Sequence, residues 1–333
     1  MKVIFSHSLP FSLAHGGVQV LIESLMQSLA GLGVEVEPER WWDEKQHGDI
    51  LHFVGRPNGN HVRFARDKGY KVVLTDLLDE TGSRTKRELA VQRATIRFSQ
   101  RMFPQLTGRL GWDAYRSVDA LVFIVPHERD IARYLFDAAP GIVRIIPHGL
   151  PVQALEALAK PQREEDYLIS VATIDSRKNT LLLAKAARRA QVPVLFLGRP
   201  YSEQDAYYRE FISCVDNEFV RYAGYLPEPE KIARIRGARG FVLLSRFESG
   251  CFAVYEAARA GLPMLSPDLP WAQHYPAGDG IRFVRRLTMG DAAEALAAFY
   301  ATAHRRPAPI FDVNSWDKIA GQYLDLYRQI LQP

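Results

Sequence analysis

Two glutamates follow the apolar run Phe241–Leu244 at a spacing that suits a nucleotide site. The run predicts a strand, Glu248 comes shortly after it, and Glu256 lies about two turns into a predicted helix, Cys251–Ala260. Open parallel sheets bind ligands at the carboxyl ends of their strands, where Glu248 would lie and from where Glu256 could reach ribose hydroxyls. The free N–H groups at the helix start could bind a phosphate or sugar oxygen. The alternative is two surface glutamates on an amphipathic helix, a spacing that often occurs by chance.

A basic pair, Arg177 and Lys178, lies between the predicted strand Tyr167–Val171 and the predicted helix Lys178–Ala190. Cations beside a helix N-terminus suit a diphosphate. Side-chain cations could then neutralise a leaving group without a metal ion, so we expect neither a metal nor another cofactor. The alternative is a solvated loop, which is the commoner place for a basic pair.

Gly16 and Gly17 separate the predicted strand Lys2–Ser6 from the predicted helix Gly17–Leu32. Without a Cβ atom, the backbone of such a loop can approach a ligand closely, although a plain turn would also use glycine. His127 follows the apolar run Ala120–Val125, so it should lie at the same edge of the sheet as other ligand-binding groups. His52 lies inside an apolar run and is expected to be a hydrogen-bonded core residue.

Short apolar runs alternate with helical stretches along both halves of the chain, which predicts two parallel sheets with helices on both faces. A run of prolines and polar residues near 147–166 interrupts the pattern. The expected fold is therefore α/β with two Rossmann-like, doubly wound domains, 1–150 and 151–310, followed by an amphipathic helix within 311–333. The remaining predicted strands are Asp49–Val54, Lys71–Leu74, Ile142–Ile146, Val194–Leu197, Phe219–Tyr222 and Met264–Leu265, and the remaining helices are Arg84–Gln100, Glu128–Phe136, Glu228–Ile235 and Trp316–Leu331.

Five motifs in this order resemble family 4 of the retaining glycosyltransferases, which have the GT-B fold. They are the glycine loop at Gly16-Gly17, the turn Ile146-Pro147-His148-Gly149, the segment Val171–Asn179, the Glu-x7-Glu segment from Glu248 to Glu256 with Gly261, Pro263 and Ser266-Pro267-Asp268 after it, and the closing helix Trp316–Leu331. The resemblance covers nearly the whole chain.

The resemblance implies transfer of a sugar from a nucleoside-diphosphate sugar to a glycan, lipid or small molecule, with retention at the anomeric carbon. It makes residues 1–150 the acceptor side and 151–310 the donor side, and it has the last helix cross back to the first domain. Glu248 and Lys178 become the catalytic residues. The donor-binding residues would be Gly16, Gly17, Arg177, Lys178, Glu248, Gly250, Cys251, Phe252 and Glu256.

The chain departs from the family pattern at three places. Thr173 stands where many members have a phosphate-binding arginine, so Arg177 could substitute for it. Cys251 replaces a glycine and should be a small residue at a helix start, not a nucleophile. The family's histidine after the strand equivalent to Lys71–Leu74 is missing, and Asp76, with His127, is the candidate for the sugar or acceptor contact.

Two rival functions remain open for a chain with this pattern. A sugar-nucleotide epimerase would share the GT-B architecture but would place its acids and a histidine elsewhere. A non-catalytic protein that binds a nucleotide sugar or holds an assembly together would tolerate Thr173 and the missing histidine. The presence of Glu248, Glu256 and Lys178 favours the transferase.

Charge and composition limit the compartment and the binding partners that can be expected. The 333 residues carry a net charge of +4 and only two cysteines, which favours a reducing compartment over a disulfide framework, and no apolar run spans a bilayer. We expect a cytoplasmic enzyme. Its basic stretch 84–109 would contact an anionic inner-membrane face, or would be a solvated helix face. Nucleic-acid binding is not expected, because no aromatic-rich basic motif is present.

Overall fold

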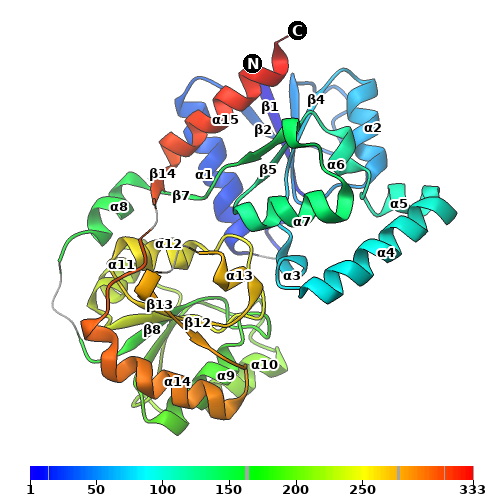
Figure 1. Ribbon diagram of the computed structural model, residues 1–333. Helices are drawn as coiled ribbons and strands as arrows, with labels where there is room; N and C mark the ends of the chain where they lie inside the picture. Colours follow the sequence, from blue (N-terminus) through cyan, green and yellow to red (C-terminus); the bar gives the residue numbers. More distant parts are fainter. Residues whose placement is uncertain (14, 162–164, 276–277, 311, 333) are drawn as a thin grey trace. The chain divides into compact units, whose positions relative to one another are not determined.

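A computed structural model describes residues 1–13, 15–161, 165–275, 278–310 and 312–332. The chain forms two compact units (Figure 1). Unit 1 comprises Met1–Gly149 and Asn314–Pro333, and unit 2 comprises Leu150–Val313. Each unit is built around its own parallel sheet, so each can be described by itself.

Unit 1 contains a six-stranded parallel sheet with the order β2-β1-β3-β4-β5-β6. A parallel sheet covered on both faces needs strands that are apolar throughout, and β3 meets this requirement because all its residues are buried. The strands are β1 Lys2–Ser6, β2 Glu35–Pro38, β3 Ile50–Val54, β4 Lys71–Thr75, β5 Ala120–Phe123 and β6 Val143–Ile145.

Helices cover both faces of this sheet, and the C-terminal helix α15 (Trp316–Leu331) lies beside α1 (Gly17–Gly31) in Figure 1. Ser28 on α1 donates a hydrogen bond of 3.1 Å to Asp317 on α15. The connection between β2 and β3, residues 39–49, contains no helix and lies wholly within the described part of the chain. The other helices of unit 1 are α2 Gly59–Asp67, α3 Asp79–Gly82, α4 Lys86–Met102, α5 Pro104–Arg109, α6 Ala114–Ser117, α7 Pro126–Phe136 and η1 Pro140–Ile142.

The turn before unit 2 depends on a glycine. Strand β7 (Gly149–Leu150) pairs with β14 (Asn314–Ser315). A Cβ atom at position 149 would lie 2.8 Å from both the Cα and the N atom of Trp316. Any larger residue at Gly149 would therefore push apart the two segments that connect the units.

Unit 2 repeats the plan with a six-stranded sheet of order β10-β9-β8-β11-β12-β13. Its strands are β8 Leu168–Val171, β9 Val194–Leu197, β10 Val220–Gly224, β11 Gly240–Val242, β12 Met264–Pro267 and β13 Ile281–Val284. Its helices are α8 Val152–Leu158, α9 Thr180–Ala190, α10 Ala206–Ser213, α11 Glu228–Gly237, α12 Phe252–Arg259, α13 Pro270–Gln273, η2 Gly278–Gly280, α14 Met289–Thr302 and η3 Ala303–Arg305.

The predicted α/β fold with two parallel sheets is confirmed, and β1, β9 and α15 have the predicted bounds. Two predicted strands end early: β5 stops at Phe123 and β11 at Val242, because the apolar residues beyond them stay buried without continuing the ladder. The strand β2 was not predicted, since its sequence Glu-Val-Glu-Pro has no apolar run and it needs only one partner at the sheet edge.

His52 is the hydrogen-bonded core residue that the sequence predicts. Its side chain is fully buried, with Nδ1 2.7 Å from the hydroxyl of Tyr327 on α15 and Nε2 2.7 Å from Oγ1 of Thr75 on β4. Burial lowers the pKa of His52 to about 3, from an ordinary value of 6.5. His52 therefore joins β3, β4 and α15 as a neutral imidazole.

This buried histidine should make stability depend on pH. Between pH 6.5 and about 3 the unfolded chain binds a proton that the folded chain does not, so stability falls as the pH falls, by about 1.4 kcal/mol for each unit. His52→Gln keeps a hydrogen-bond donor and an acceptor but does not titrate. It should therefore remove this contribution to the slope of the unfolding free energy against pH. Urea unfolding of both proteins from pH 7 down to pH 4 measures it. Parallel slopes in the two proteins would contradict the assignment.

Candidate functional site

The strands β8 and β11 are neighbours in the sheet of unit 2, so the segments that follow them meet at one edge. Lys178 comes after β8, just before α9, and Glu248 comes after β11, just before α12. Both side chains are almost fully buried, with 11% of Lys178 and 5% of Glu248 exposed. The sheet topology thus brings together two charged residues that are far apart in the sequence.

Glu248 forms ion pairs with both cations of the basic pair. Lys178 Nζ lies 2.6 Å from Oε1 of Glu248, and Arg177 Nη1 lies 3.2 Å from Oε2. The guanidinium of Arg177 also lies 5.8 Å from the centre of the Phe247 ring. The three charged groups form one cluster with a single net positive charge.

Short-range contacts hold the basic pair in place. The backbone N–H of Lys178 donates to Oδ1 of Asp175 at 2.7 Å, and the hydroxyl of Thr173 donates to the other oxygen of Asp175 at 2.7 Å. The N–H of Arg246 donates to the carbonyl of Arg177, which ties this loop to the one after β11. Thr173 therefore helps Asp175 to orient the turn that carries Lys178.

Electrostatics keep both members of the central pair charged. Burial is the largest effect and would lower the pKa of Lys178, but the charge of Glu248, the hydrogen bond that Lys178 donates to it and a contribution from Cys251 together outweigh burial and raise the pKa. Burial would likewise raise the pKa of Glu248, but Lys178 and Arg177 outweigh it and hold the pKa below the ordinary value of 4.5. A charged pair in such a dry place is costly unless it is well paired, and such pairs concentrate at functional sites.

Glu256 lies on α12 and forms a separate ion pair. Its Oε1 is 2.7 Å from Nζ of Lys231 on α11, and the same ammonium is 2.7 Å from Glu228. Burial raises the pKa of Glu256, and Lys231 offsets only part of that rise. Glu256 is thus a buried carboxylate within α12 that is held by one cation.

The start of α12 lies between the two glutamates. Cys251 is its N-cap residue, and the Cys251 N–H donates a hydrogen bond of 3.2 Å to the hydroxyl of Tyr275. Burial raises the pKa of the Cys251 thiol to about 11, so the thiol is protonated at neutral pH and does not suit a nucleophile. Gly250 and Phe252 flank this position, and Phe252 is the first residue of the helix.

The remaining predicted site residues lie in unit 1. Gly16 is the N-cap residue of α1 with a φ of 140°, a backbone conformation that favours glycine, and Gly17 begins the helix. Asp76 is buried after β4; it accepts a short hydrogen bond from Tyr115 and lies 4.0 Å from Nε of Arg56. His127 is half-buried, with Nε2 2.9 Å from the carbonyl oxygen of Gly82.

Three residues of these sites were not predicted from the sequence. Lys231 has no motif that connects it with Glu256, because the two side chains meet only when α11 and α12 have both packed on α8 in the folded unit. Arg56 donates to the hydroxyl of Tyr115 at 2.9 Å and lies over the rings of Tyr115 and Phe136. Asp175 lies inside a recognised segment, and only the structure shows that it fixes the turn at Lys178.

The basic stretch 84–109 forms α4 and α5, and its charges are partly paired. Arg84 lies 3.5 Å from Glu80, and Arg93 and Arg97 lie 3.9 and 3.8 Å from Asp137. Only Leu89 and Ile96 of α4 are buried. Large apolar side chains on this segment are exposed, namely Val91, Phe98, Met102 and Phe103. Within the described part of the chain, no helix is long and apolar enough to cross a bilayer.

Residues 152–298 match the family model described as "Glycosyl transferases group 1". This stretch contains the basic pair and both glutamates. A GDP-mannose:cellobiosyl-diphosphopolyprenol alpha-mannosyltransferase of Xanthomonas oryzae pv. oryzae is 28% identical over 240 residues, which cover 67% of this chain and 63% of that protein. The alignment thus spans less than two thirds of the length of this curated relative.

Solved structures extend the likeness to the whole chain. Sucrose-phosphate synthase from Thermosynechococcus elongatus superposes with a TM-score of 0.68 at 16% identity and covers 99% of this chain and 98% of its own. A glycosyltransferase from Rickettsia africae gives a TM-score of 0.65 at 10% identity, with 99% and 98% covered. The chain therefore has the GT-B fold with two Rossmann-like units, and residues 152–298 of its second unit are similar to group 1 glycosyltransferases.

Proposed function

We propose that this protein is a retaining glycosyltransferase that moves a hexosyl unit from a nucleoside-diphosphate sugar to a saccharide acceptor. One observation carries the proposal: Lys178 and Glu248 form a buried ion pair at the carboxyl edge of a parallel sheet, and the partly exposed Arg177 pairs with the same carboxylate. The cluster lies within the stretch that matches group 1 glycosyltransferases. Desolvated cations beside a carboxylate suit a reaction that separates a diphosphate anion from a sugar cation.

Each member of the cluster would have its own role. The donor's diphosphate would bind Lys178 and Arg177, with the start of α12 supplying backbone N–H groups. As the bond between the anomeric carbon and the diphosphate breaks, negative charge grows beside these cations. Positive charge grows on the sugar, where Glu248 would stabilise it. The acceptor oxygen would form the new bond on the same face and pass its proton to the departing diphosphate, which gives retention.

Glu256 would bind the donor's ribose hydroxyls. A carboxylate at this distance along the helix can accept both hydrogen bonds, as acids do in other α/β nucleotide sites. The ion pair with Lys231 holds its oxygens in one orientation. In unit 1, Gly16 and Gly17 would let the backbone approach the donor, and Asp76 and His127 are the proposed sugar or acceptor contacts.

The acceptor is proposed to be a lipid-linked saccharide and the first donor to test is GDP-mannose. The Xanthomonas relative is named for that donor and for a cellobiosyl-diphosphopolyprenol acceptor. A lipid-linked acceptor would require the enzyme to work at a membrane surface. The exposed apolar and basic side chains of α4 support contact with such a surface.

Membrane contact through α4 should depend on anionic lipid. Flotation with phosphatidylglycerol vesicles should recover the protein at low salt and lose most of it at high salt, because screening weakens the arginine contacts. Phe98→Ser combined with Met102→Ser should weaken recovery. Tyr225→Ser, which changes an exposed aromatic residue of unit 2, is the control. Equal recovery with phosphatidylcholine vesicles, or none with either lipid, would contradict the proposed contact.

The transferase itself is tested by release of nucleotide from a panel of UDP-, GDP- and ADP-sugars. Retaining transferases transfer some sugar to water, so slow hydrolysis of one donor is expected even without the acceptor. Because side-chain cations neutralise the diphosphate, the rate should be the same with and without EDTA. Loss of turnover in EDTA with recovery on adding Mn²⁺ would overturn the metal-independent mechanism. No hydrolysis and no nucleotide binding with any donor would overturn the proposed function.

A further inference from the structure

Unit 1 contains a cavity of about 690 Å³ that the proposed donor site does not use. It lies between β1, β3, α2 and the connection 39–49, so it belongs entirely to one compact unit. Its apolar lining includes Ile4, Leu51 and Phe53 from the strands and Ala65 from α2. A cavity of this volume is in the range that holds a drug-sized or disaccharide-sized molecule.

The fold explains why a cavity forms at this place. In doubly wound sheets a helix usually follows each strand and covers the sheet, but β2 is joined to β3 by a loop. The side chains of Ile4, Leu51 and Phe53 belong to the same core cluster as residues of α2, and they also line the cavity, where the loop takes the place of a second helix. Trp41, at the start of this loop, lines the cavity with 72% of its surface exposed.

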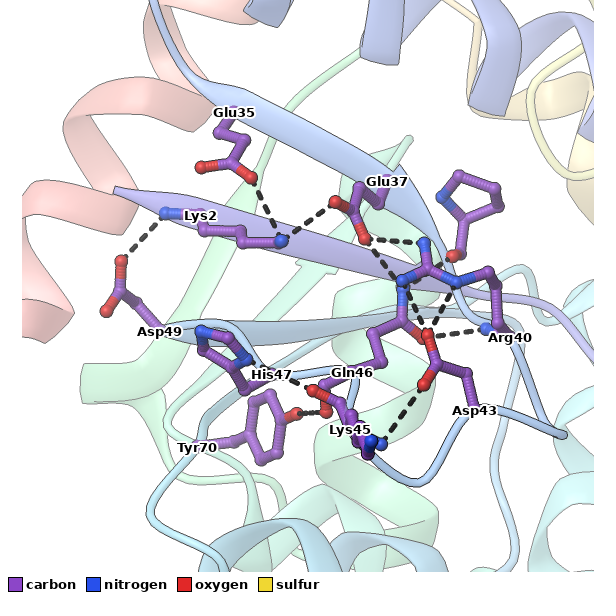
Figure 2. Close-up of polar contacts among 11 residues, drawn as sticks. Lys2, Glu35, Glu37, Arg40, Asp43, Lys45, Gln46, His47, Asp49 and Tyr70 are labelled. Atoms are coloured by element: carbon purple, nitrogen blue, oxygen red, sulfur yellow. Dashed lines mark hydrogen bonds and ion pairs between the residues drawn. The ribbon is translucent and has the colours of Figure 1, made fainter.

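Polar contacts shape the loop before any ligand arrives, as Figure 2 shows. The amide of Gln46 bridges the loop: its oxygen accepts from the N–H of Arg40 at 2.7 Å, and its nitrogen donates to Glu37 at 3.0 Å. Arg40 donates to Asp43 through Nε at 3.0 Å and Nη2 at 2.8 Å. The hydroxyl of Tyr70 donates to the carbonyl of Gln46 at 3.2 Å. These hydrogen bonds hold the loop in one conformation, so it forms one side of the cavity without a bound ligand.

Charge pairing also defines what the cavity can bind. Hydrogen bonds from Lys2, Gln46 and Arg40 lower the pKa of Glu37 to about 2, so this carboxylate stays ionised and keeps Arg40 paired. The ionisable side chains that line the cavity include as many acids as permanent cations, namely Glu39, Asp43 and Glu44 against Arg40, Arg56 and Lys68. The balance does not favour a phosphate or a nucleotide, which would need excess positive charge.

Aromatic faces complete the site. Trp41 and Phe64 line the cavity, and both keep more than half of their surface exposed. An aromatic face carries partial negative charge and attracts the C–H groups of an apolar ring face. Carboxylates and amides such as Glu39 and Asn58 lie in the same lining and can hydrogen-bond hydroxyl groups. This lining suits a neutral ligand with apolar ring faces and with hydroxyl groups at the edge of the ring. A pyranose sugar has these properties.

We infer that this cavity binds a neutral saccharide, as a sugar unit of the acceptor. The acceptor role rests on the proposed transferase activity, whereas saccharide binding rests on the cavity alone. Trp41 would stack on the sugar, and Gln46 would act as a positioning residue that holds the loop in shape. The carboxylates of the lining would bind hydroxyl groups.

The chain offers a matched pair of variants for testing this site. Trp41 lines the cavity, while its neighbour Trp42 is 84% exposed and is not among the lining residues. Calorimetric titration of the full chain with cellotetraose, maltotetraose and mannotetraose, without nucleotide, should show binding of at least one. Trp41→Ala should weaken that binding about tenfold, the effect of losing about 1.4 kcal/mol of stacking and burial. Trp42→Ala should leave it unchanged, and Phe64→Ala should weaken it.

Separate measurements distinguish the two hypotheses. Donor hydrolysis without acceptor tests the transferase, and it should be equal in Trp42→Ala and in the unchanged protein. If none of the three tetrasaccharides binds, or if Trp41→Ala and Trp42→Ala weaken binding equally, the saccharide assignment is wrong. If a tetrasaccharide binds as expected but no donor is hydrolysed, the cavity assignment stands and its acceptor role fails.

Discussion

Glu248→Gln is expected to lower kcat by about 100-fold or more while nucleotide affinity survives. The substitution keeps the side-chain volume but removes the negative charge next to which the sugar would become positive. Lys178 and Arg177 lose their shared partner and remain able to bind a diphosphate. Nucleoside-diphosphate affinity should therefore be unchanged or tighter, which separates a catalytic role from a binding role.

The measurement combines kcat for the donor that is hydrolysed with calorimetric affinity for its nucleotide. Glu230→Gln is the control, because Glu230 is exposed on α11 of the same unit. Thermal unfolding of each variant must first show that it folds, since a buried ion pair that loses one partner can cost several kcal/mol. Normal turnover of a folded Glu248→Gln variant would contradict the catalytic role of Glu248.

Glu256→Gln is expected to raise the donor KM by about ten- to a hundredfold and to change kcat less. Its ribose contact would be present in the ground state and in the transition state alike, so losing it weakens binding uniformly. Replacing a charged hydrogen-bond partner costs about 1.5–3 kcal/mol. Lys231 would keep its ion pair with Glu228, so the local structure should survive.

Nucleotide affinity decides this second prediction. Calorimetry should show weaker binding of the nucleoside diphosphate and of the free nucleoside monophosphate by the same factor, because both contain the ribose. The control variant Glu230→Gln should bind both as the unchanged protein does. Unchanged KM with a large loss of kcat would place Glu256 at the sugar and not at the ribose.

Much of the fold could be predicted because its strands are continuous apolar runs. Burial on both faces requires such runs, and β1 and β9 show it with their bounds unchanged. The edge strand β2 could not be predicted, because it is stabilised by pairing with β1 and not by an apolar pattern. The helix α14 was missed as well: its alanine-rich sequence has a weak apolar stripe, and it is positioned by packing on α9.

The candidate site, like the fold, could be predicted only in part. Arg177, Lys178, Glu248 and Glu256 could be selected from sequence, since each follows a predicted strand or lies on the next helix. Their roles remain proposals. The sequence could not show that Glu248 pairs with both cations or that Glu256 pairs with Lys231, because those contacts join separate loops and helices.

The sequence by itself determined the two-sheet α/β plan and the residue types available for a diphosphate and a ribose. Apolar periodicity is a local property, and strand ends can be read from it. Only the tertiary structure decided which of those residues touch, that Thr173 and Asp175 set the turn of Lys178, and that a loop at 39–49 leaves a cavity over β1 and β3. Such contacts depend on strand order and helix packing, which join distant segments and leave no mark in either segment alone.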